Sequence, residues 1–423
     1  MNIRLVFLAS ALALCACARE APAPSAASTA TPEQAVHDWA LPSVAGAAQP
    51  DLILAPDGRL LLSWISSLPG RRHALQFAAF DRAGKWQSAP RTIAVGNNMF
   101  VNWADTPHLA ATDDGALWVH WLQKTAAAPY AYDVMLSRSR DGGANWSAPI
   151  AVNDDGLPVE HGFVSLWPAA DDSIGVAWLD GRKMGGAGHG GGHDAPAADG
   201  AMMTLRSARF DADLARHDES ELDASTCDCC QTGAALTANG PLLVYRDRTF
   251  DEIRDIYSTR LQGATWARPK PVHADGWKMP ACPVNGPSVA AVGDRAVVAW
   301  YTAPDGEPVL KAARSSNSGD SFSAPIEIDR GTAVQGRVSV ALDARQAWIL
   351  WLREEAAGQS LWLARYAPDL SRELQRQRVA TLQGRGRGTG FPQLVLRDGA
   401  AHVVWTDVVD GTSHLQGAII ARP

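Results

Sequence analysis

The chain has 423 residues, of which 46% are hydrophobic and 20% are charged, as in ordinary soluble globular proteins. This length exceeds the size at which one simple core usually stops growing, so the chain either holds two domains or repeats one unit. The formal net charge of -7 gives no indication of nucleic acid or of an anionic membrane as a partner.

The first residues of the chain resemble a bacterial lipoprotein signal peptide. Arg4 supplies a basic start, and the apolar run 5–14 is too short to span a bilayer as a mature helix. The run ends in the letters LCAC, which resemble the lipobox. Cys17 fits the lipidated position better than Cys15, because Cys15 follows a leucine where a small residue is needed. The alternative is plain secretion with cleavage near Ala18.

A segment rich in Ala, Pro, Ser and Thr follows at 18–36, and this composition is typical of a flexible tether. We therefore predict a signal peptide at 1–17, a tether at 18–36 and one folded domain at 37–423. The resemblance implies a lipid anchor in the bacterial cell envelope, at the outer membrane or the periplasmic face. That compartment is oxidising.

Within the folded domain, an apolar run that ends in an aromatic residue recurs seven times. The seven aromatic residues are Trp64, Trp121, Trp178, Tyr245, Trp300, Trp351 and Trp405. Each run follows a turn signal such as Asp57-Gly58, and another strand-like segment precedes the turn, so each copy reads as a β-hairpin. Evenly spaced hairpins with almost no helical periodicity predict an all-β protein, a β-propeller of four-stranded antiparallel blades. A pair of β-sandwiches would not give one period across the whole chain.

The repeat count predicts the number of blades and the closure of the ring. Seven copies favour seven blades. The last copy ends close to the C-terminus with no room for a fourth strand, and residues 37–41 could supply that strand. Six blades is the alternative.

Two turn segments resemble the Asp-box, the repeat signature of sialidases and related propellers. The matching residues are Ser139, Asp141, Gly143 and Trp146 in the first, and Ser315, Asn317, Gly319 and Phe322 in the second. An acidic or amide side chain caps backbone N–H groups of the turn, glycine takes a positive φ, and the aromatic residue packs between strands. The resemblance implies a sialidase-like propeller in which these loops are structural and lie opposite the ligand face.

Sialidase chemistry, by resemblance, uses three arginines that grip a carboxylate, a tyrosine with a glutamate partner, and an acidic Asp. Arg246, at the end of a strand after a Gly turn, resembles the second arginine. Segment 47–52 has alanine where the first arginine is expected, Arg337 or Arg385 could serve as the third without a matching motif, and no tyrosine follows Tyr366. The match therefore favours ligand binding without classical sialidase chemistry.

The charged loop after that strand has two interpretations. Alternating charges around Arg246, Asp247 and Arg248 usually form a salt-bridged rim, which is the favoured interpretation. Functionally, Arg246 and Arg248 would hold an anionic group, with Asp247 as the candidate acid or base.

Four cysteines lie in loops that lead into the innermost strands of the fourth and fifth copies. They are Cys227, Cys229, Cys230 and Cys282. These loops open on one face, so we expect the thiols to lie close together. Two disulfides are favoured outside the cytoplasm, and a bond from Cys282 to Cys229 or Cys230 would join two blades. The alternative is a copper or zinc site, because thiolates select Cu(I) and Zn.

Histidines support the metal alternative. His189 and His193 lie in a Gly-rich loop after Trp178, and His161 precedes the third copy, so all three should face the cysteines. A solvated flexible loop is the commoner meaning of a Gly/His tract. Three functions result: a propeller that binds a small-molecule, glycan or protein ligand as a monomer, a divergent sialidase-type glycoside hydrolase, and a copper- or zinc-handling envelope protein.

Overall fold

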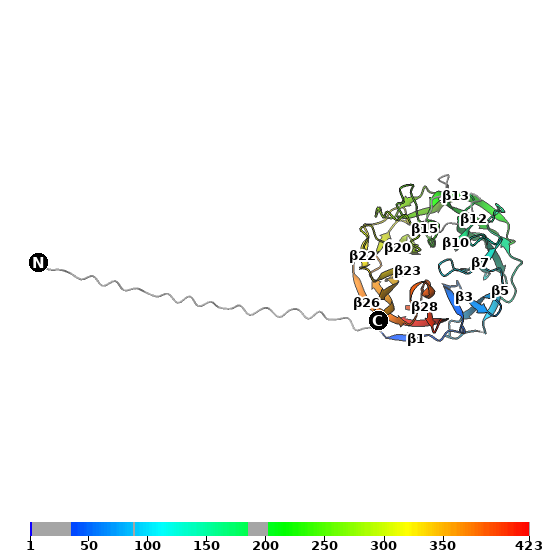
Figure 1. Ribbon diagram of the computed structural model, residues 1–423, viewed down its shortest axis with the longest axis horizontal. Coiled ribbons are helices and arrows are strands. Elements are labelled where there is room, and N and C mark those ends of the chain that lie inside the picture. The colour runs from blue at the N-terminus through cyan, green and yellow to red at the C-terminus, as the bar shows by residue number, and fades with distance from the viewer. Residues whose placement is uncertain (2–34, 88, 185–201, 423) are drawn as a thin grey trace. The chain divides into compact units, whose positions relative to one another are not determined.

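A computed structural model describes residue 1 and the ranges 35–87, 89–184 and 202–422. Seven antiparallel sheets follow one another within the compact unit Glu33–Pro423. They are arranged as blades around a central axis (Figure 1). The described residues contain one helical segment, the 3-10 turn η1 at Gly386–Thr389. The seven-bladed all-β propeller is confirmed, and the six-bladed alternative is wrong.

Each blade is a meander whose first strand lies innermost. The first blade consists of β2 (Ala47–Leu54), β3 (Leu60–Leu68), β4 (Arg72–Phe80) and β5 (Arg91–Gly96). The second consists of β6 (Leu109–Ala111), β7 (Leu117–Lys124), β8 (Tyr132–Ser139) and β9 (Ile150–Ala151). The third consists of β10 (His161–Pro168), β11 (Ile174–Asp180), β12 (Met203–Phe210) and β13 (Arg216–Thr226). The fourth blade has β14 (Gly233–Thr237), β15 (Gly240–Arg246) and β16 (Ile256–Gln262), with the short strands β17 (Thr265–Trp266) and β18 (Lys270–Pro271) both paired to β16.

The remaining blades complete the ring. The fifth blade consists of β19 (Ser288–Val292), β20 (Arg295–Thr302), β21 (Val309–Ser315) and β22 (Ile326–Arg330). The sixth consists of β23 (Val334–Leu342), β24 (Ala347–Glu355), β25 (Gly358–Tyr366) and β26 (Glu373–Leu382). The seventh consists of β27 (Gln393–Arg397), β28 (Ala400–Val409) and β29 (Thr412–Ala421), joined by β1 (Val36–Asp38). In the part of the chain that the structure describes, no helix is long and apolar enough to span a bilayer. The predicted lipidation site Cys17 lies outside the described residues.

The N-terminal strand closes the ring. β1 pairs with β29 as the outermost strand of the seventh blade, with His37 opposite Ile419, and the backbone N–H of Trp39 bonds to Gly417 O at 2.9 Å. The indole of Trp39 stacks on Trp86 of the first blade, with ring centroids 5.3 Å apart. The closing strand predicted within 37–41 thus exists and begins at Val36.

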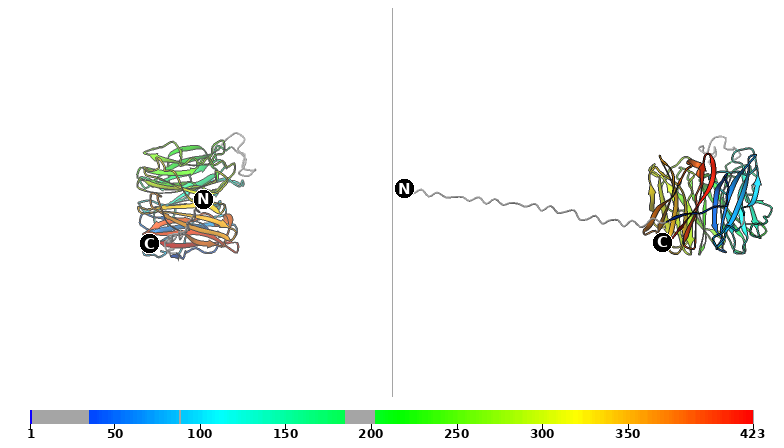
Figure 2. Two further views of the ribbon diagram at one scale, coloured as in Figure 1. Left: turned by 90° about the vertical axis from the view of Figure 1, so that its left-hand side faces the viewer. Right: turned by 90° about the horizontal axis from the view of Figure 1, so that it is seen from below.

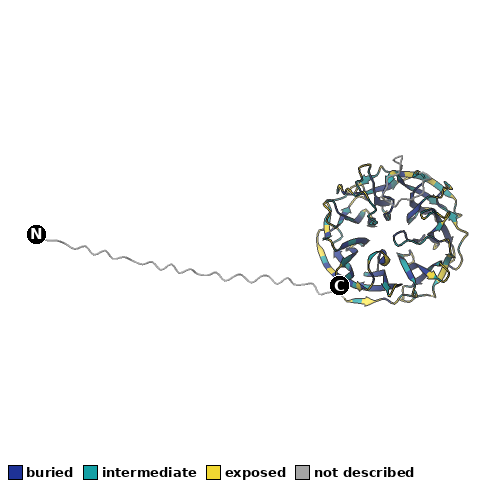
Figure 3. Ribbon diagram, viewed as in Figure 1, coloured by how far each residue is buried: buried dark blue, intermediate teal, exposed yellow. Residues whose placement is uncertain are grey.

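The core lies between the blades. The recurring tryptophans of the second strands, Trp64, Trp178, Trp300 and Trp351, are almost completely buried. Figure 3 shows buried residues concentrated in the blades and exposed residues at the rim. Large apolar side chains at one position of the repeat therefore fill the space between neighbouring blades.

Both predicted Asp-box turns join a third strand to a fourth. Ser139 Oγ accepts the N–H of Gly143 at 2.8 Å, and Asp141 Oδ1 accepts the N–H of Asn145 at 2.8 Å. These bonds to Asn145 and Ser139 hold the pKa of the exposed Asp141 carboxyl at about 2. The turn at Ser315 and Asn317 repeats the pattern.

The meander order gives the ring two distinct faces. We call front face the side that carries the loops leading into the innermost strands and the loops between second and third strands. The back face carries the turns between first and second strands and between third and fourth strands, including both Asp-box turns. Figure 2 shows the blades edge-on, with these two sets of loops at opposite ends of the strands.

Candidate metal centre

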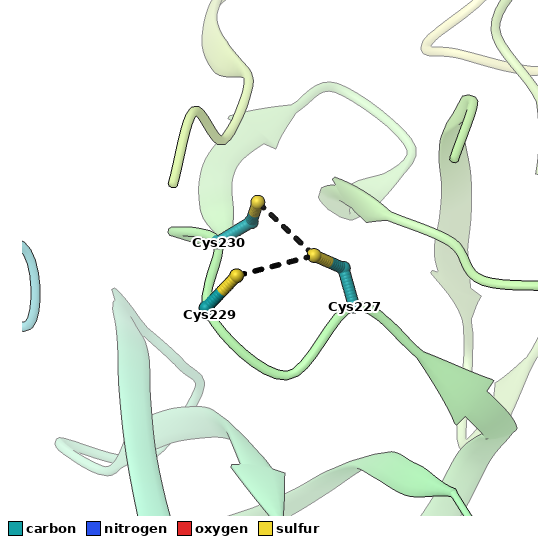
Figure 4. A group of neighbouring side chains, drawn as sticks. All are labelled: Cys227, Cys229 and Cys230. Atoms are coloured by element: carbon teal, nitrogen blue, oxygen red, sulfur yellow. Dashed lines mark hydrogen bonds between the residues drawn. The ribbon is translucent and has the colours of Figure 1, made fainter. Parts of the chain in front are cut away.

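Three cysteine thiols meet on the front face, in the loop between β13 and β14. Cys227 Sγ lies 3.2 Å from Cys230 Sγ and 3.7 Å from Cys229 Sγ (Figure 4). All three sulfur atoms lie within 4.8 Å of one another. The side chains are only 1%, 5% and 1% exposed for Cys227, Cys229 and Cys230 respectively. The cluster is therefore shielded from bulk water.

The loop is held by the end of β15. The backbone N–H of Cys227 bonds to Arg246 O at 3.0 Å, and Thr226 forms an isolated antiparallel bridge with Asp247. The guanidinium of Arg254 donates a hydrogen bond to Cys227 Sγ at 3.1 Å. The sequence thus places a fixed cation against one of the three sulfur atoms.

Cys282 reaches the same region from the fifth blade. Its Sγ lies 3.7 Å from Asp228 Oδ1, and Asp228, Cys229 and Cys282 form a second group whose ligand atoms lie within 4.8 Å. Cys282 is half-buried, whereas Asp228 is buried. The two groups share Cys229.

The two disulfides that the sequence favoured are not seen among the four described cysteines. None of the four cysteines that the structure describes is bonded to another. The separation of 3.2 Å between the sulfurs of Cys227 and Cys230 exceeds the bond length of about 2.05 Å by a wide margin. Cys227 Sγ instead lies near two sulfur atoms, at 3.2 Å from Cys230 and 3.7 Å from Cys229.

Burial and hydrogen bonding act differently on the three thiols. Burial raises the pKa of Cys227 to about 11 and raises the pKa of Cys229 well above its usual range. For Cys230 burial acts in the same direction, but hydrogen bonds from Cys227 and Cys229 and the nearby Arg246 guanidinium outweigh it and lower the pKa of this thiol. One member of the cluster is therefore the preferred thiolate.

Arg246, the candidate for binding a carboxylate, has a different environment from the one expected. Its Nη2 donates to Asn285 O and to Tyr301 O, both at 2.7 Å, and its guanidinium lies over the Trp277 ring at 4.9 Å. Only 1% of the residue is exposed. Arg246 therefore joins the fourth blade to the fifth and offers little surface to an anion.

The two residues after Arg246 are also tied into local networks. Arg248 Nη2 bonds to Glu252 at 2.6 Å, as in the salt-bridged rim. Burial and the neighbouring Asp223 carboxylate raise the pKa of Asp247 to about 7. Asp247 and Asp223 line an open cavity of about 550 Å³.

Among the described residues, the histidine candidate His161 belongs to a different group from the thiols. His161 Nε2 lies 3.0 Å from Asp155 Oδ2, and its Nδ1 lies 3.0 Å from Tyr132 O. Asp155, His161 and Asp180 form a third compact group, but Arg182 donates to Asp180 at 2.8 Å and supplies the positive charge there. His189 and His193 lie outside the described residues.

A tyrosine–glutamate pair escaped the sequence analysis. Tyr132 Oη donates to Glu160 at 2.7 Å, and nearby Asp105 Oδ1 accepts the N–H of Phe163 at 2.8 Å. Tyr132 is 1% exposed and its ring stacks on that of Phe100, with ring centroids 4.0 Å apart, so the Tyr132–Glu160 hydrogen bond is buried. Neither Tyr132 nor Glu160 lies in a motif, and only the three-dimensional arrangement joins them.

The known proteins that match this chain are solved structures of similar fold. No family model and no curated protein sequence matches the chain. Similar solved structures include the polysaccharide lyase Uly1, with a TM-score of 0.51, 10% identity and coverage of 93% of this chain and 94% of that chain. The NanB sialidase from Streptococcus pneumoniae gives a TM-score of 0.45, 10% identity and coverage of 86% and 83%.

A third similar structure is the α-L-arabinofuranosidase arb93a from Fusarium graminearum, with a TM-score of 0.47, 10% identity and coverage of 89% of this chain and 93% of that chain. The chain is thus a β-propeller, similar in fold to the solved structure of the polysaccharide lyase Uly1. Identities this low show the fold alone.

Proposed function

We propose that this propeller binds Cu(I) through the thiolates of Cys227, Cys229 and Cys230, and that the metal ion is the ligand of its front face. The observation that carries the proposal is the meeting of three buried sulfur atoms within 4.8 Å of one another. Soft thiolate ligands select Cu(I) over harder ions.

The sulfur separations support a shared ion. Thiolates bound to one ion through bonds of about 2.3 Å lie roughly 3.8 to 4.0 Å apart. The distance of 3.7 Å between Cys227 and Cys229 already matches, and the distance of 3.2 Å between Cys227 and Cys230 needs only a small opening. Metal loading therefore requires loss of the thiol protons and little movement of the loop.

The number of ligands and the local charge favour Cu(I) over Zn(II). Structural zinc sites take four ligands, and the fourth cysteine, Cys282, belongs to the second group with Asp228. Three thiolates and one Cu(I) carry a net charge of about -2. The buried guanidinium groups of Arg246 and Arg254 lie next to Cys230 and Cys227 and offset that charge.

Cys282 gives the site an access route. Cys282 is half-buried and shares Cys229 with the inner group, so an ion can bind first to Cys282 and Cys229 and then pass to the three buried thiolates. Each exchange replaces one sulfur ligand by another and never leaves the ion without a thiolate. Together with the predicted lipid anchor at Cys17, this supports copper handling at the cell envelope.

The test is a competition titration of the fully reduced protein with Cu(I) and a chromogenic Cu(I) chelator, without oxygen. We expect one ion per chain, loss of tight binding in Cys230→Ser, and unchanged stoichiometry but slower loading in the matched variant Cys282→Ser. Tighter binding of Zn(II) than of Cu(I) would overturn the choice of metal. Four oxidised thiols and no metal in protein purified from the envelope would overturn the proposal.

A further inference from the structure

On the back face, two turns fill the space between neighbouring blades. In the second blade Gly143 packs onto Phe77 of the first blade, and a Cβ added to this glycine would lie 2.1 Å from the ring. In the fifth blade Gly319 packs onto Leu242 of the fourth, where the corresponding distance is 2.5 Å. Each Asp-box turn thus fills the groove between its own blade and the preceding blade.

The fourth blade lacks this seal. β16 ends at Gln262 and β17 begins at Thr265, so a tight two-residue turn replaces the longer loop. Among the described residues, no atom lies within 4 Å of a Cβ added at Gly263. The turn stops short of the third blade, and a cavity of about 400 Å³ opens between the two blades.

Two tryptophans form a corner in this cavity. Trp167 of the third blade and Trp266 of the fourth lie at 84° with ring centroids 5.8 Å apart, and both line the cavity. A Cβ on Gly175 would lie 2.0 Å from the Trp167 ring, so glycine is required there to seat the indole. Pro168 and Pro241 continue the apolar wall.

The charged side chains among the described residues that line the cavity are one pair of opposite sign. Arg209 Nε donates to Asp218 Oδ2 at 3.1 Å, and both residues line the cavity. Their side chains are 35% and 65% exposed, so the pair is held weakly and its atoms remain accessible to a ligand. The polar groups therefore offer donors and acceptors without a net charge.

We propose that this cavity binds one neutral pyranose ring of a glycan, at a site separate from the metal centre and on the opposite face. The apolar C–H face of a pyranose packs on an indole, while hydroxyl groups at its edge accept from Arg209 and donate to Asp218. The volume of about 400 Å³ lies within the range of roughly 300 to 1,000 Å³ that small-molecule sites occupy.

The charge pair decides between ligand classes. An anionic or cationic ligand would be attracted by one member of the pair and repelled by the other, so the pair gives no net preference for a charged ligand. An aliphatic chain would bury Arg209 and Asp218 without replacing their hydrogen bonds to water. A neutral ring that is apolar on one face and hydroxylated at the edge satisfies both parts of the cavity.

The experiment measures binding of four methyl glycosides (glucoside, mannoside, fucoside and N-acetylglucosaminide) to the full protein by saturation-transfer NMR and calorimetry. We expect at least one to bind saturably. Its Kd should rise about tenfold or more in Trp266→Ala. In the matched control Trp86→Ala, which removes the tryptophan at the corresponding turn of the first blade, the Kd should stay unchanged.

A second variant keeps the test independent of folding. Ala170 is exposed on a turn at the cavity, so Ala170→Trp fills the space without disturbing a core. This variant should abolish binding while the thermal midpoint stays that of the parent. Saturable binding of decanoate with no glycoside bound, or glycoside binding that survives Ala170→Trp, would overturn the proposal.

Discussion

The guanidinium of Arg254 donates a hydrogen bond of 3.1 Å to the sulfur of Cys227, and both side chains are 1% exposed. Arg254 also bonds to Glu252 through Nε and Nη2. Because Glu252 holds the other two nitrogens, the Arg254 guanidinium cannot rotate away from the Cys227 sulfur without breaking its hydrogen bonds to Glu252. Arg254 is therefore a positioning residue for the thiolate that the proposed Cu(I) site needs.

We expect Arg254→Ala to weaken Cu(I) binding about tenfold to a hundredfold, the usual cost of removing a group that orients a metal ligand. Competition titration against the chromogenic chelator measures the change. Arg260→Ala is the matched control, because Arg260 is also buried in the same blade but bonds to Asp320 on the back face. Equal affinities of Arg254→Ala and the parent would contradict the role of Arg254.

The two adjacent glycines of the first Asp-box turn should differ in their tolerance of alanine. Both have positive φ, +67° at Gly142 and +83° at Gly143, but only Gly143 packs against Phe77. We expect Gly142→Ala to lower the free energy of unfolding by about 1 to 2 kcal/mol through strain alone. Gly143→Ala should add an overpacking cost of about 1 to 3 kcal/mol. Urea denaturation followed by tryptophan fluorescence distinguishes the variants, and equal losses would refute the packing role.

Ring closure gives a third prediction. Trp39 stacks on Trp86 and meets Phe80 edge-on at 5.1 Å, so Trp39→Ala should cost about 3 to 5 kcal/mol of stability. Hydrogen exchange should accelerate along β29, to which β1 is paired. His37→Ala, at an exposed position of the same strand, should change neither quantity appreciably. Unaltered exchange in β29 of Trp39→Ala would show that β1 does not hold the ring closed.

The buried Asp105 predicts a pH dependence of stability. Burial raises the pKa of its carboxyl from 3.8 to about 7, so the folded chain binds this proton more tightly than the unfolded chain. The free energy of unfolding should therefore fall as the pH rises from about 4 to about 7, by at most about 1.4 kcal/mol for each pH unit. Asp105→Asn should reduce that slope, because an amide does not titrate in this pH range. The amide oxygen can still accept the hydrogen bond from the Phe163 N–H, so the local contact is kept. Thermal midpoints measured between pH 4 and pH 7 report this pH dependence for the parent and for Asp105→Asn. Equal slopes in the two proteins would exclude Asp105 as the source of the pH dependence.

The sequence predicted the architecture because each blade repeats one local pattern. Period-two strands, a Gly turn and a buried aromatic residue recur with little dependence on distant contacts, so counting them sufficed. The closing strand followed from the missing strand of the last copy. The start of that strand at Val36 depends on pairing with Ile420, a contact between the two ends of the domain.

The sequence predicted the site only in part, because topology places loops but not side-chain directions. Cys227 and Cys282 could be assigned to one face from the strand order alone. That Arg246 points at the carbonyl oxygens of Asn285 and Tyr301 depends on the neighbouring blade. The favoured disulfides followed from the oxidising compartment, whereas the clustered thiols follow from the path of the short loop between β13 and β14.

The position of β1 also determines where any attachment acts. β1 is the outermost strand of its blade, so the chain preceding residue 35 joins the domain at the rim, away from the axis. A pull on that chain is borne first by the three residue pairs between β1 and β29, which makes this short strand the mechanical weak point of the ring.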